Sequence, residues 1–272
     1  MTANSNNALS FRALHEQEGA LLLPNPWDVG SAKILEQVGF KALATTSGGF
    51  AWGVGKLDGA VSLEEKLDHC RALSSAVDIP VMADLGPGFG ASPEDIAKTV
   101  KAAAETGLAG CSIEDAANPY FGGSYETSLA IERIAAAVEV ARGLPNDFVL
   151  TARCEEFSTG NRNLDECLER LSAYEAAGAD VLHAPGLVDL EQIKTVCTTL
   201  KNPVNVLIGF RQMTHSARDL EAVGVKRVSI GTDLARIAYG AALNASKEFL
   251  ETGTISKCDI DARSRDIASA MV

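Results

Sequence analysis

The amino-acid sequence predicts an α/β protein of the (β/α)₈ TIM-barrel class. Eight short apolar segments alternate with eight longer amphipathic segments, and four of the amphipathic segments run into a glycine before the next apolar segment. Eight such units in 272 residues suit one barrel better than a doubly wound open sheet, which usually has fewer strands before its topology breaks. We therefore expect residues 1–272 to form a single barrel domain with a C-terminal helical extension.

The expected strands are short apolar runs, each long enough to be buried inside a sheet. They are residues 20–23, 42–46, 81–84, 110–113, 148–153, 181–184, 204–208 and 227–230. The expected helices are residues 31–38, 63–76, 93–105, 129–141, 164–177, 190–199, 216–223 and 234–250. One helix start carries an N-cap, a first-turn proline and an acid in Ser92-Pro93-Glu94. Glycines typical of helix C-termini precede four of the strands, at Gly39, Gly107, Gly178 and Gly224.

Composition and charge argue against several classes of protein. The chain has 24 Lys and Arg against 36 Asp and Glu, a net charge of −12 and a pI near 4.8, so its field repels nucleic acid and anionic membranes. No apolar run approaches the ~18 residues of a membrane span, and the polar start lacks a signal-peptide pattern. The six cysteines form no C-x-x-C pair, which argues against zinc-ribbon and thioredoxin-like sites. We expect a cytoplasmic protein with reduced thiols and no nucleic-acid or membrane partner.

Charged side chains stand at the ends of neighbouring predicted strands, where the active sites of (β/α)₈ barrels lie. Asp84 ends the third strand, Glu114 and Asp115 follow the fourth, and Arg153 ends the fifth. Carboxylates on adjacent strands repel each other unless a cation or proton lies between them. Oxygen ligands without His or Cys favour Mg²⁺, or Mn²⁺, over zinc. Asp84 and Glu114 are therefore candidate metal ligands, and helix capping or pairing with Arg153 is the structural alternative.

Two further segments are candidates for binding an anion. Arg153 can bind a carboxylate through two hydrogen bonds or stabilise an oxyanion, and it can also form an ion pair at the barrel rim. The backbone of Ser47-Gly48-Gly49, after the second strand, can approach a carboxylate or phosphate closely, although a tight turn explains these residues equally well. Asn205 and Gly209 stand at the seventh strand, and Asn205 is included among the candidate substrate contacts.

Other conspicuous residues are expected to have structural roles. Residues 86–90, Gly-Pro-Gly-Phe-Gly, lack the Lys-Ser/Thr of a Walker motif and the spacing of a dinucleotide loop, so we expect a shaped turn beside the third strand. His183 lies in an apolar run and is expected in the core. Cys154 follows Arg153 and should point to the opposite face of its strand, and Cys111 should be buried likewise.

Taken in order along nearly the whole chain, these segments resemble the isocitrate lyase/phosphoenolpyruvate (PEP) mutase superfamily, in particular its shorter PEP mutase-like members. The resemblance is carried by LPNPWD at 23–28, ATTSGG at 44–49, ADLGPGFG at 83–90, SIED at 112–115, LTAR at 150–153, APGL at 184–187, PVNVL at 203–207 and VSIG at 228–231. The ordered set is specific, although no single segment is.

The resemblance implies a barrel whose last helices are exchanged between paired subunits. It also implies chemistry on 2-oxo acids or PEP, in which Mg²⁺ holds the substrate and a C–C or P–C bond is made or broken through a pyruvate-type enolate. By this resemblance Asp84 and Glu114 match the metal-site acids, Arg153 matches the substrate arginine, and Asp58 matches an aspartate on a loop near the metal. Ser47 and Gly48 match a backbone cradle for the carboxylate. We therefore expect Arg153 and Asp58 to be catalytic and the following to bind substrate: Ser47, Gly48, Gly49, Arg153 and Asn205.

The sequence departs from the family pattern in two places. Gly86 stands where the family usually carries a second acid, which removes charge from the metal site. The lyases carry Lys-Lys-Cys-Gly-His after the glutamate and the mutases carry a lysine there, whereas residues 116–124 contain no Lys, Cys or His. An isocitrate or methylisocitrate lyase and an ordinary PEP mutase are therefore not expected. Tyr120 or Tyr125 is a candidate for the missing proton donor.

We therefore expect a Mg²⁺-dependent lyase or hydrolase that acts on a small anionic 2-oxo dicarboxylate of the oxaloacetate type. Decarboxylation and retro-Claisen hydrolysis need a metal, an enolate and at most a water, so the missing cysteine affects them least. Two alternatives stay open: phosphorus–carbon chemistry on a phosphonopyruvate-like compound, and a metabolite-binding protein that has lost activity. We also expect a homotetramer built from dimers, because the Ala-rich helix 234–250 is followed by a further segment, 259–270. A frayed C-terminal tail is the alternative.

Overall fold

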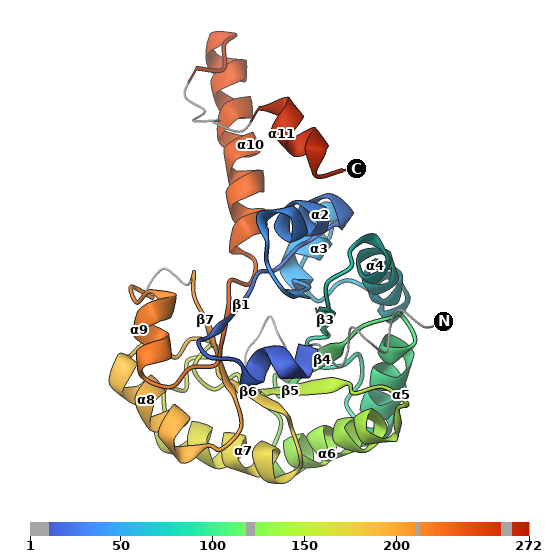
Figure 1. Cartoon of the computed structure of the whole chain (residues 1–272), viewed down its shortest axis with the longest axis vertical. Coiled ribbons are helices and arrows are strands. Elements are labelled where there is room, and N and C mark those ends of the chain that lie inside the picture. Colours follow the sequence, from blue (N-terminus) through green and yellow to red (C-terminus); the bar gives the residue numbers. More distant parts are fainter. Residues whose placement is uncertain (1–10, 118–122, 210–212, 257–262, 272) are drawn as a thin grey trace.

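The computed structural model describes residues 11–117, 123–209, 213–256 and 263–271, and it contains the expected eight-stranded parallel sheet (Figure 1). The strands are β1 (Leu21–Leu23), β2 (Leu43–Ala44), β3 (Val81–Asp84), β4 (Gly110–Glu114), β5 (Val149–Arg153), β6 (Val181–His183), β7 (Val204–Leu207) and β8 (Arg227–Ser229). Their order in the sheet is β1-β8-β7-β6-β5-β4-β3-β2. The N–H of Ala44 donates to the carbonyl of Pro24 at 3.0 Å across the remaining seam, so the barrel is nearly closed.

Helices follow the strands and cover the outside of the sheet (Figure 1). They are α2 (Val29–Val38), α3 (Ser47–Gly53), α4 (Leu63–Ala76), α5 (Pro93–Ala104), α6 (Thr127–Gly143), α7 (Leu164–Ala176), α8 (Leu190–Thr199), α9 (Ala217–Ala222), α10 (Asp233–Thr252) and α11 (Ser264–Ser269). All eight expected helices are present, with ends that differ by a few residues. The four glycines expected at helix C-termini have φ between 90° and 106°, in the left-handed region that favours glycine: Gly39, Gly107, Gly178 and Gly224.

The segment after β2 differs from the prediction. The expected strand 42–46 is shorter, because Thr46 is the N-cap of α3 and its hydroxyl accepts from the N–H of Gly49 at 3.3 Å. Residues 47–49, for which a tight turn is one of the two alternatives expected, therefore form the first turn of a helix. A Cβ at position 49 would lie 3.0 Å from the Cβ atoms of both Trp27 and Ala235, so close packing requires glycine there. Glycine is a poor helix former, which explains why the sequence pattern does not reveal α3.

A short helix and an apolar cluster close the N-terminal end of the barrel. Residues 11–16 are helical, and the fully buried Phe11 belongs to an apolar cluster inside the barrel. The other members of this cluster come from the helix–strand joints and the strands themselves: Leu21, Leu23, Ala42, Ala44, Met82, Ala109, Val149 and Val181. A larger core, which includes Cys111 and Cys154 as expected, packs the outer face of the sheet against the helices. Polar side chains therefore gather at the opposite, C-terminal end of the strands.

The long helix α10 projects away from the barrel, and α11 turns back toward α2 (Figure 1). Lys33 Nζ donates to the carbonyl of Met271 at 3.0 Å, and Gln37 Nε2 donates to Ser269 Oγ at 3.0 Å. Exchange of these helices with a second subunit stays a prediction, and residues 259–262 of the segment concerned lie outside the described residues. In the described part of the chain no helix is long and apolar enough to cross a membrane.

Candidate active site

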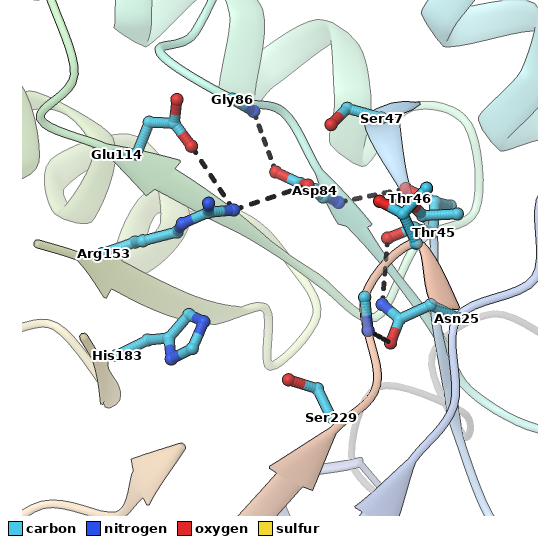
Figure 2. A network of polar contacts seen from close by, with 12 residues as sticks. Asn25, Thr45, Thr46, Ser47, Asp84, Gly86, Glu114, Arg153, His183 and Ser229 are labelled. Atoms are coloured by element: carbon cyan, nitrogen blue, oxygen red, sulfur yellow. Dashed lines mark hydrogen bonds and ion pairs between the residues drawn. The ribbon is translucent and has the colours of Figure 1, made fainter. Parts of the chain in front are cut away.

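The C-terminal ends of three adjacent strands bring one guanidinium between two carboxylates. Asp84, Glu114 and Arg153 are the last residues of β3, β4 and β5. Nη1 of Arg153 lies 3.6 Å from Asp84 Oδ2 and 3.4 Å from Glu114 Oε2 (Figure 2). Nε of the same side chain donates to Glu155 Oε1. The ion pairs expected as the structural alternative are thus present, and they hold Arg153 in place at the mouth of the barrel.

The carboxylates of this cluster differ in their affinity for a proton. Burial raises the pKa of Glu114 well above its usual value. The positive charge of Arg153 lowers this pKa, but too little to cancel burial, and the negative charges of neighbouring carboxylates raise it further. Burial and the charge of Asp84 also raise the pKa of Asp58. Burial acts in the same direction on Asp84, but the charges of Arg153 and Lys66 outweigh it and lower the pKa of Asp84. The cluster is rich enough in buried negative charge to favour an additional cation.

Lys66 is a second cation at the site, and no motif singles it out. It lies on α4 with 3% of its surface exposed, and its Nζ donates to Thr45 Oγ1 at 2.9 Å. The same hydroxyl accepts from the backbone N–H of Asp84 at 3.0 Å. A sequence signal exists, because Lys66 begins a stripe at i, i+4 and i+7 that continues with the buried Cys70 and Leu73. A lysine on the buried stripe of a helix is uncommon and indicates a paired or functional charge.

Asp58 lies on the loop after α3 and reaches the same site. Ser47 Oγ donates to Asp58 Oδ2 at 3.3 Å. Gly48 lies beside this pair, since a Cβ there would be 3.2 Å from Asp58 Oδ2 and 3.3 Å from Thr232 Oγ1. Both distances are shorter than an ordinary van der Waals contact, so a larger residue at position 48 would displace Asp58 or Thr232.

Asn25 ties the mouth of the barrel together near the seam between β1 and β2. Its Nδ2 donates to the carbonyl of Thr45 at 3.3 Å. Its Oδ1 accepts from the N–H groups of Ile230 at 3.0 Å and Gly231 at 2.7 Å. One side chain thus links the ends of β1, β2 and β8, where the sheet itself has few hydrogen bonds.

The glycine-rich loop 86–90 forms a shaped turn beside Asp84, as expected. The N–H of Gly86 donates to Asp84 Oδ1 at 3.0 Å. Gly88 has φ 86°, and a Cβ there would collide with Ile96 Cδ1. The turn therefore depends on glycine for both conformation and space, and it fixes one oxygen of Asp84.

We expect Arg133→Met to lower the free energy of unfolding by about 3 kcal/mol, because buried carbonyl groups of this loop lose their donor. Arg133 is 1% exposed, and its guanidinium donates to the carbonyl oxygens of Pro87, Gly90 and Ala91, the last two at 2.8 Å. Urea unfolding followed by circular dichroism measures the change. Arg71→Met is the control, since the Arg71 side chain is 57% exposed and should change stability by less than about 0.5 kcal/mol. Equal losses in the two variants would contradict this role.

Two adjoining cavities of about 610 and 640 Å³ open at the mouth of the barrel. Their shared wall includes four of the expected site residues: Ser47, Asp58, Asp84 and Arg153. The first cavity runs into the barrel and includes residues near its floor, such as Met82 and Arg227. The second extends beneath the loop 86–90 and includes Glu114. The structure thus brings together most of the residues that the sequence places at the site.

Asn205 and His183 both line the first cavity. Asn205 is the second residue of β7 and not its end, so it lines the first cavity below the mouth, where its Nδ2 lies 2.9 Å from His183 Nδ1. His183 is buried but lines the same cavity, in register with Arg153 (Figure 2). Burial and the charge of Arg153 lower the pKa of His183 to about 3, so its ring is neutral. An apolar run does not distinguish a strand residue that faces the outer core from one that faces the cavity.

Two further candidates lie away from the cavities. Asp115 points to the opposite side of the chain from Glu114, the residue before it. Its Oδ2 accepts a hydrogen bond from the hydroxyl of Tyr174 at 2.7 Å. The ring of Tyr125 packs 4.0 Å from the guanidinium of Arg133. Tyr120 lies outside the described residues. Tyr125 thus packs on Arg133 and is not among the residues that line the two cavities, and its role as a proton donor stays a prediction.

Comparison with known proteins decides the family. A family model described as phosphoenolpyruvate phosphomutase matches residues 11–250. The 2-methylisocitrate lyase of Shewanella oneidensis is 30% identical over 256 residues, which are 90% of this chain and 86% of that protein. The chain belongs to the PEP mutase/isocitrate lyase superfamily.

Solved structures of superfamily members agree with this assignment. A Burkholderia cenocepacia J2315 protein, provisionally named a lyase/mutase, is 45% identical with a TM-score of 0.95, and the match covers 99% of this chain and 96% of that one. The crystal structure of oxaloacetate acetylhydrolase is 25% identical with a TM-score of 0.84, covering 97% and 94%. Membership places the chain among lyases and mutases of small acids.

The Mg²⁺ that the superfamily generally uses fits the donor set of this site. Asp84 and Glu114 both direct a carboxylate oxygen at one cation, the guanidinium of Arg153. Gly86 leaves space beside them, because a Cβ there would be 4.0 Å from Glu114 Oε1. No group of three or more His, Cys, Asp or Glu residues in the described ranges is arranged to hold an ion. Mg²⁺ commonly takes one or two carboxylates and completes its shell with water and substrate oxygens, so two acids suffice.

Proposed function

We propose that the protein is a Mg²⁺-dependent lyase or hydrolase of a small 2-oxo dicarboxylate of the oxaloacetate type. The observation that carries this proposal is the position of Arg153 between Asp84 and Glu114 at the mouth of a cavity. A fixed guanidinium beside paired acids can stabilise the oxygen of a bound oxo acid that gains negative charge during the reaction. Similarity to oxaloacetate acetylhydrolase supports the class of acid.

The residues at the mouth have separate roles in this proposal. Asp84 and Glu114 would hold Mg²⁺, which would supply Lewis-acid stabilisation of negative charge on the bound 2-oxo acid. Arg153 donates hydrogen bonds to the oxygen that gains negative charge when the enolate forms. Its acidic partners already fix its orientation, so little reorganisation is needed during the reaction. Ser47 and Gly48 begin α3 and offer backbone N–H groups to the substrate carboxylate.

Asp58 is the candidate for proton transfer. Its raised pKa brings the carboxyl group closer to neutral pH, and Ser47 Oγ orients it through Oδ2. A protonated Asp58 can deliver its proton to the enolate carbon, which completes a decarboxylation. An ionised Asp58 can instead accept a proton from the water that attacks the 2-oxo carbon, which begins a retro-Claisen hydrolysis. The same side chain therefore serves either reaction.

The test is a turnover assay of oxaloacetate, pyruvate, 2-oxoglutarate and phosphonopyruvate with Mg²⁺ and with EDTA. We expect oxaloacetate to disappear faster than with Mg²⁺ alone, and EDTA to abolish the protein-dependent rate. Pyruvate with carbon dioxide identifies decarboxylation, and oxalate with acetate identifies hydrolysis. Turnover of phosphonopyruvate alone would favour the phosphorus–carbon alternative. Thermal stabilisation by an acid without any turnover would favour a binding protein.

We further propose that the chain is a dimer of dimers in which α10 and α11 pack against a second subunit. The side chains of Ile237, Leu243 and Leu250 on α10 are 65%, 55% and 88% exposed in the single chain, and burying them would be favourable. We expect a tetramer for the full chain in light scattering at micromolar concentration, and a smaller species for a chain ending at Glu251. A monomeric full chain would show that these helices are not exchanged.

A further inference from the structure

Arg227 is a cation at the floor of the first cavity. It is the first residue of β8, is 2% exposed and lines the cavity. Its Nε donates to Asn205 Oδ1 at 2.9 Å and its Nη2 donates to Thr151 Oγ1 at 3.0 Å. The acceptors of both short hydrogen bonds are therefore uncharged oxygens. Burial of a charge without a counter-ion is strongly unfavourable. An arginine held this way indicates that its anion comes from a ligand.

The remaining contacts of Arg227 do not compensate its charge. Nη1 lies 3.4 Å from His15 Nε2 and 3.5 Å from the sulfur of Met82, both long contacts to weak acceptors. The His15 Nδ1 lies 2.9 Å from the carbonyl oxygen of Phe11, which assigns the proton to Nδ1 and leaves Nε2 as the acceptor. Burial and the charge of Arg227 lower the pKa of His15 to about 4, so His15 is neutral. Burial lowers the pKa of Arg227 to about 9, which still leaves it charged at neutral pH.

Arg153 and Arg227, two of the arginines that line the first cavity, are surrounded differently. Arg153 at the mouth contacts the carboxylates of Asp84, Glu114 and Glu155, whereas among the described residues no carboxylate forms an ion pair with Arg227. Thr151, which accepts from Arg227, is two residues before Arg153 on β5 and faces the same side of the strand. Two residues of a strand span about 6.6 Å, so the floor lies roughly that far below the mouth. A short diacid can reach from one level to the other.

We infer that Arg227 binds a second carboxylate of the substrate on the floor of the cavity, so that the protein selects dicarboxylates over monocarboxylates. The inference rests on the proposed function for the 2-oxo acid end, which is bound at the mouth. Asn205 acts as a positioning residue, because its Oδ1 holds Nε of Arg227 while its Nδ2 donates to Ser229 Oγ at 3.0 Å. This polar network below the mouth gives Asn205 a role that its position in the sequence does not reveal.

Two matched pairs of acids test the floor site. 2-Oxobutyrate and oxaloacetate have the same carbon chain, as do 2-oxovalerate and 2-oxoglutarate, and each pair differs only by a methyl or carboxylate at the far end. With Mg²⁺ present, thermal-shift titrations should show at least one diacid binding about tenfold or more tighter than its monoacid. In Arg227→Gln the preference should disappear while monoacid affinity is kept. A preference that survives in Arg227→Gln, or is absent from the natural protein, would overturn the inference.

Asn205→Asp provides a second variant in case Arg227→Gln does not fold. It is nearly isosteric and places a carboxylate against Nε of Arg227, so the internal ion pair should also abolish the preference for diacids. Arg236→Gln is the matched control, because Arg236 lines the same cavity but bonds to Asp233 at 2.8 Å. The diacid preference should persist in this control. Its loss in Arg236→Gln alone would place the second carboxylate near Arg236 and overturn the inference.

A failure of the proposed function gives a different pattern. In that case neither member of either pair binds, and bromide serves as the probe of the floor. Crystals of the natural protein soaked in bromide should then show an anomalous peak beside Arg227, and crystals of Arg227→Gln should show none there. Absence of bromide beside Arg227 in the natural protein would overturn the floor site independently of the metal.

Discussion

Arg153→Lys is expected to lower kcat by about a hundredfold or more on the 2-oxo acid that the protein turns over. Lysine keeps the positive charge but loses the planar group with several N–H donors. Arg153 uses Nε for Glu155 and Nη1 for Asp84 and Glu114, and one ammonium cannot reproduce both sets of contacts. Removal of one donor to a developing oxyanion costs about 10²–10³ in rate. KM should change less than kcat, because the stabilised charge is largest in the transition state.

Steady-state kinetics on the natural protein and Arg153→Lys measure this loss. Arg236→Lys is the control, since the same substitution is made at the wall of the same cavity, where Arg236 pairs with Asp233 on its own helix. We expect the control to keep a near-natural kcat. A similar rate in Arg153→Lys would mean that Arg153 only holds the rim together.

The fold can be predicted from the sequence because the signals are local and repeated. Each buried strand is a short apolar run, and each joint from helix to strand carries the same physical requirement for a left-handed residue, as at Gly178 and Gly224. The ends of strands could be placed well enough to bring Asp84, Glu114 and Arg153 together. Their grouping follows from the parallel sheet alone, since the C-terminal ends of parallel strands meet at one edge.

The rest of the site depends on facts that are not local. Lys66 comes from a helix outside the barrel, and its contact with Thr45 exists only because α4 packs beside β2 and β3. His183 has an apolar neighbourhood in sequence, yet faces the cavity in three dimensions. Arg227 looks like a charged residue at the start of a strand, and its isolation from acids becomes visible only when β3, β5 and β7 surround it. Helix α3 is hidden because its glycines serve packing rather than helix propensity.

Asp84→Ala and Glu114→Ala are each expected to weaken Mg²⁺ binding about tenfold or more, with little loss of fold stability. The two side chains supply the charge at the metal site, and loss of one leaves Mg²⁺ with a single carboxylate. Burial raises the pKa of Glu114, so an ionised carboxylate at this position is unfavourable for the folded protein. Replacing it should therefore cost less stability than replacing an acid whose partners are all structural. Calorimetric titration of Mg²⁺ with pyruvate present measures the affinity, and urea unfolding measures the stability.

Asp115→Ala is the matched control because it changes the neighbouring acid on the opposite face of the same chain segment. Asp115 is 2% exposed, and it accepts from the hydroxyl of Tyr174 at 2.7 Å and from the N–H of Glu155 at 2.8 Å. Its loss leaves these buried donors unpaired, so this variant should lose about 1–3 kcal/mol of stability and keep its affinity for Mg²⁺. Glu114→Ala would then lower the affinity for Mg²⁺, whereas Asp115→Ala at the next residue would lower the stability of the fold. Unchanged Mg²⁺ affinity in both Asp84→Ala and Glu114→Ala would remove the metal assignment, because these are the two carboxylates proposed to hold the ion.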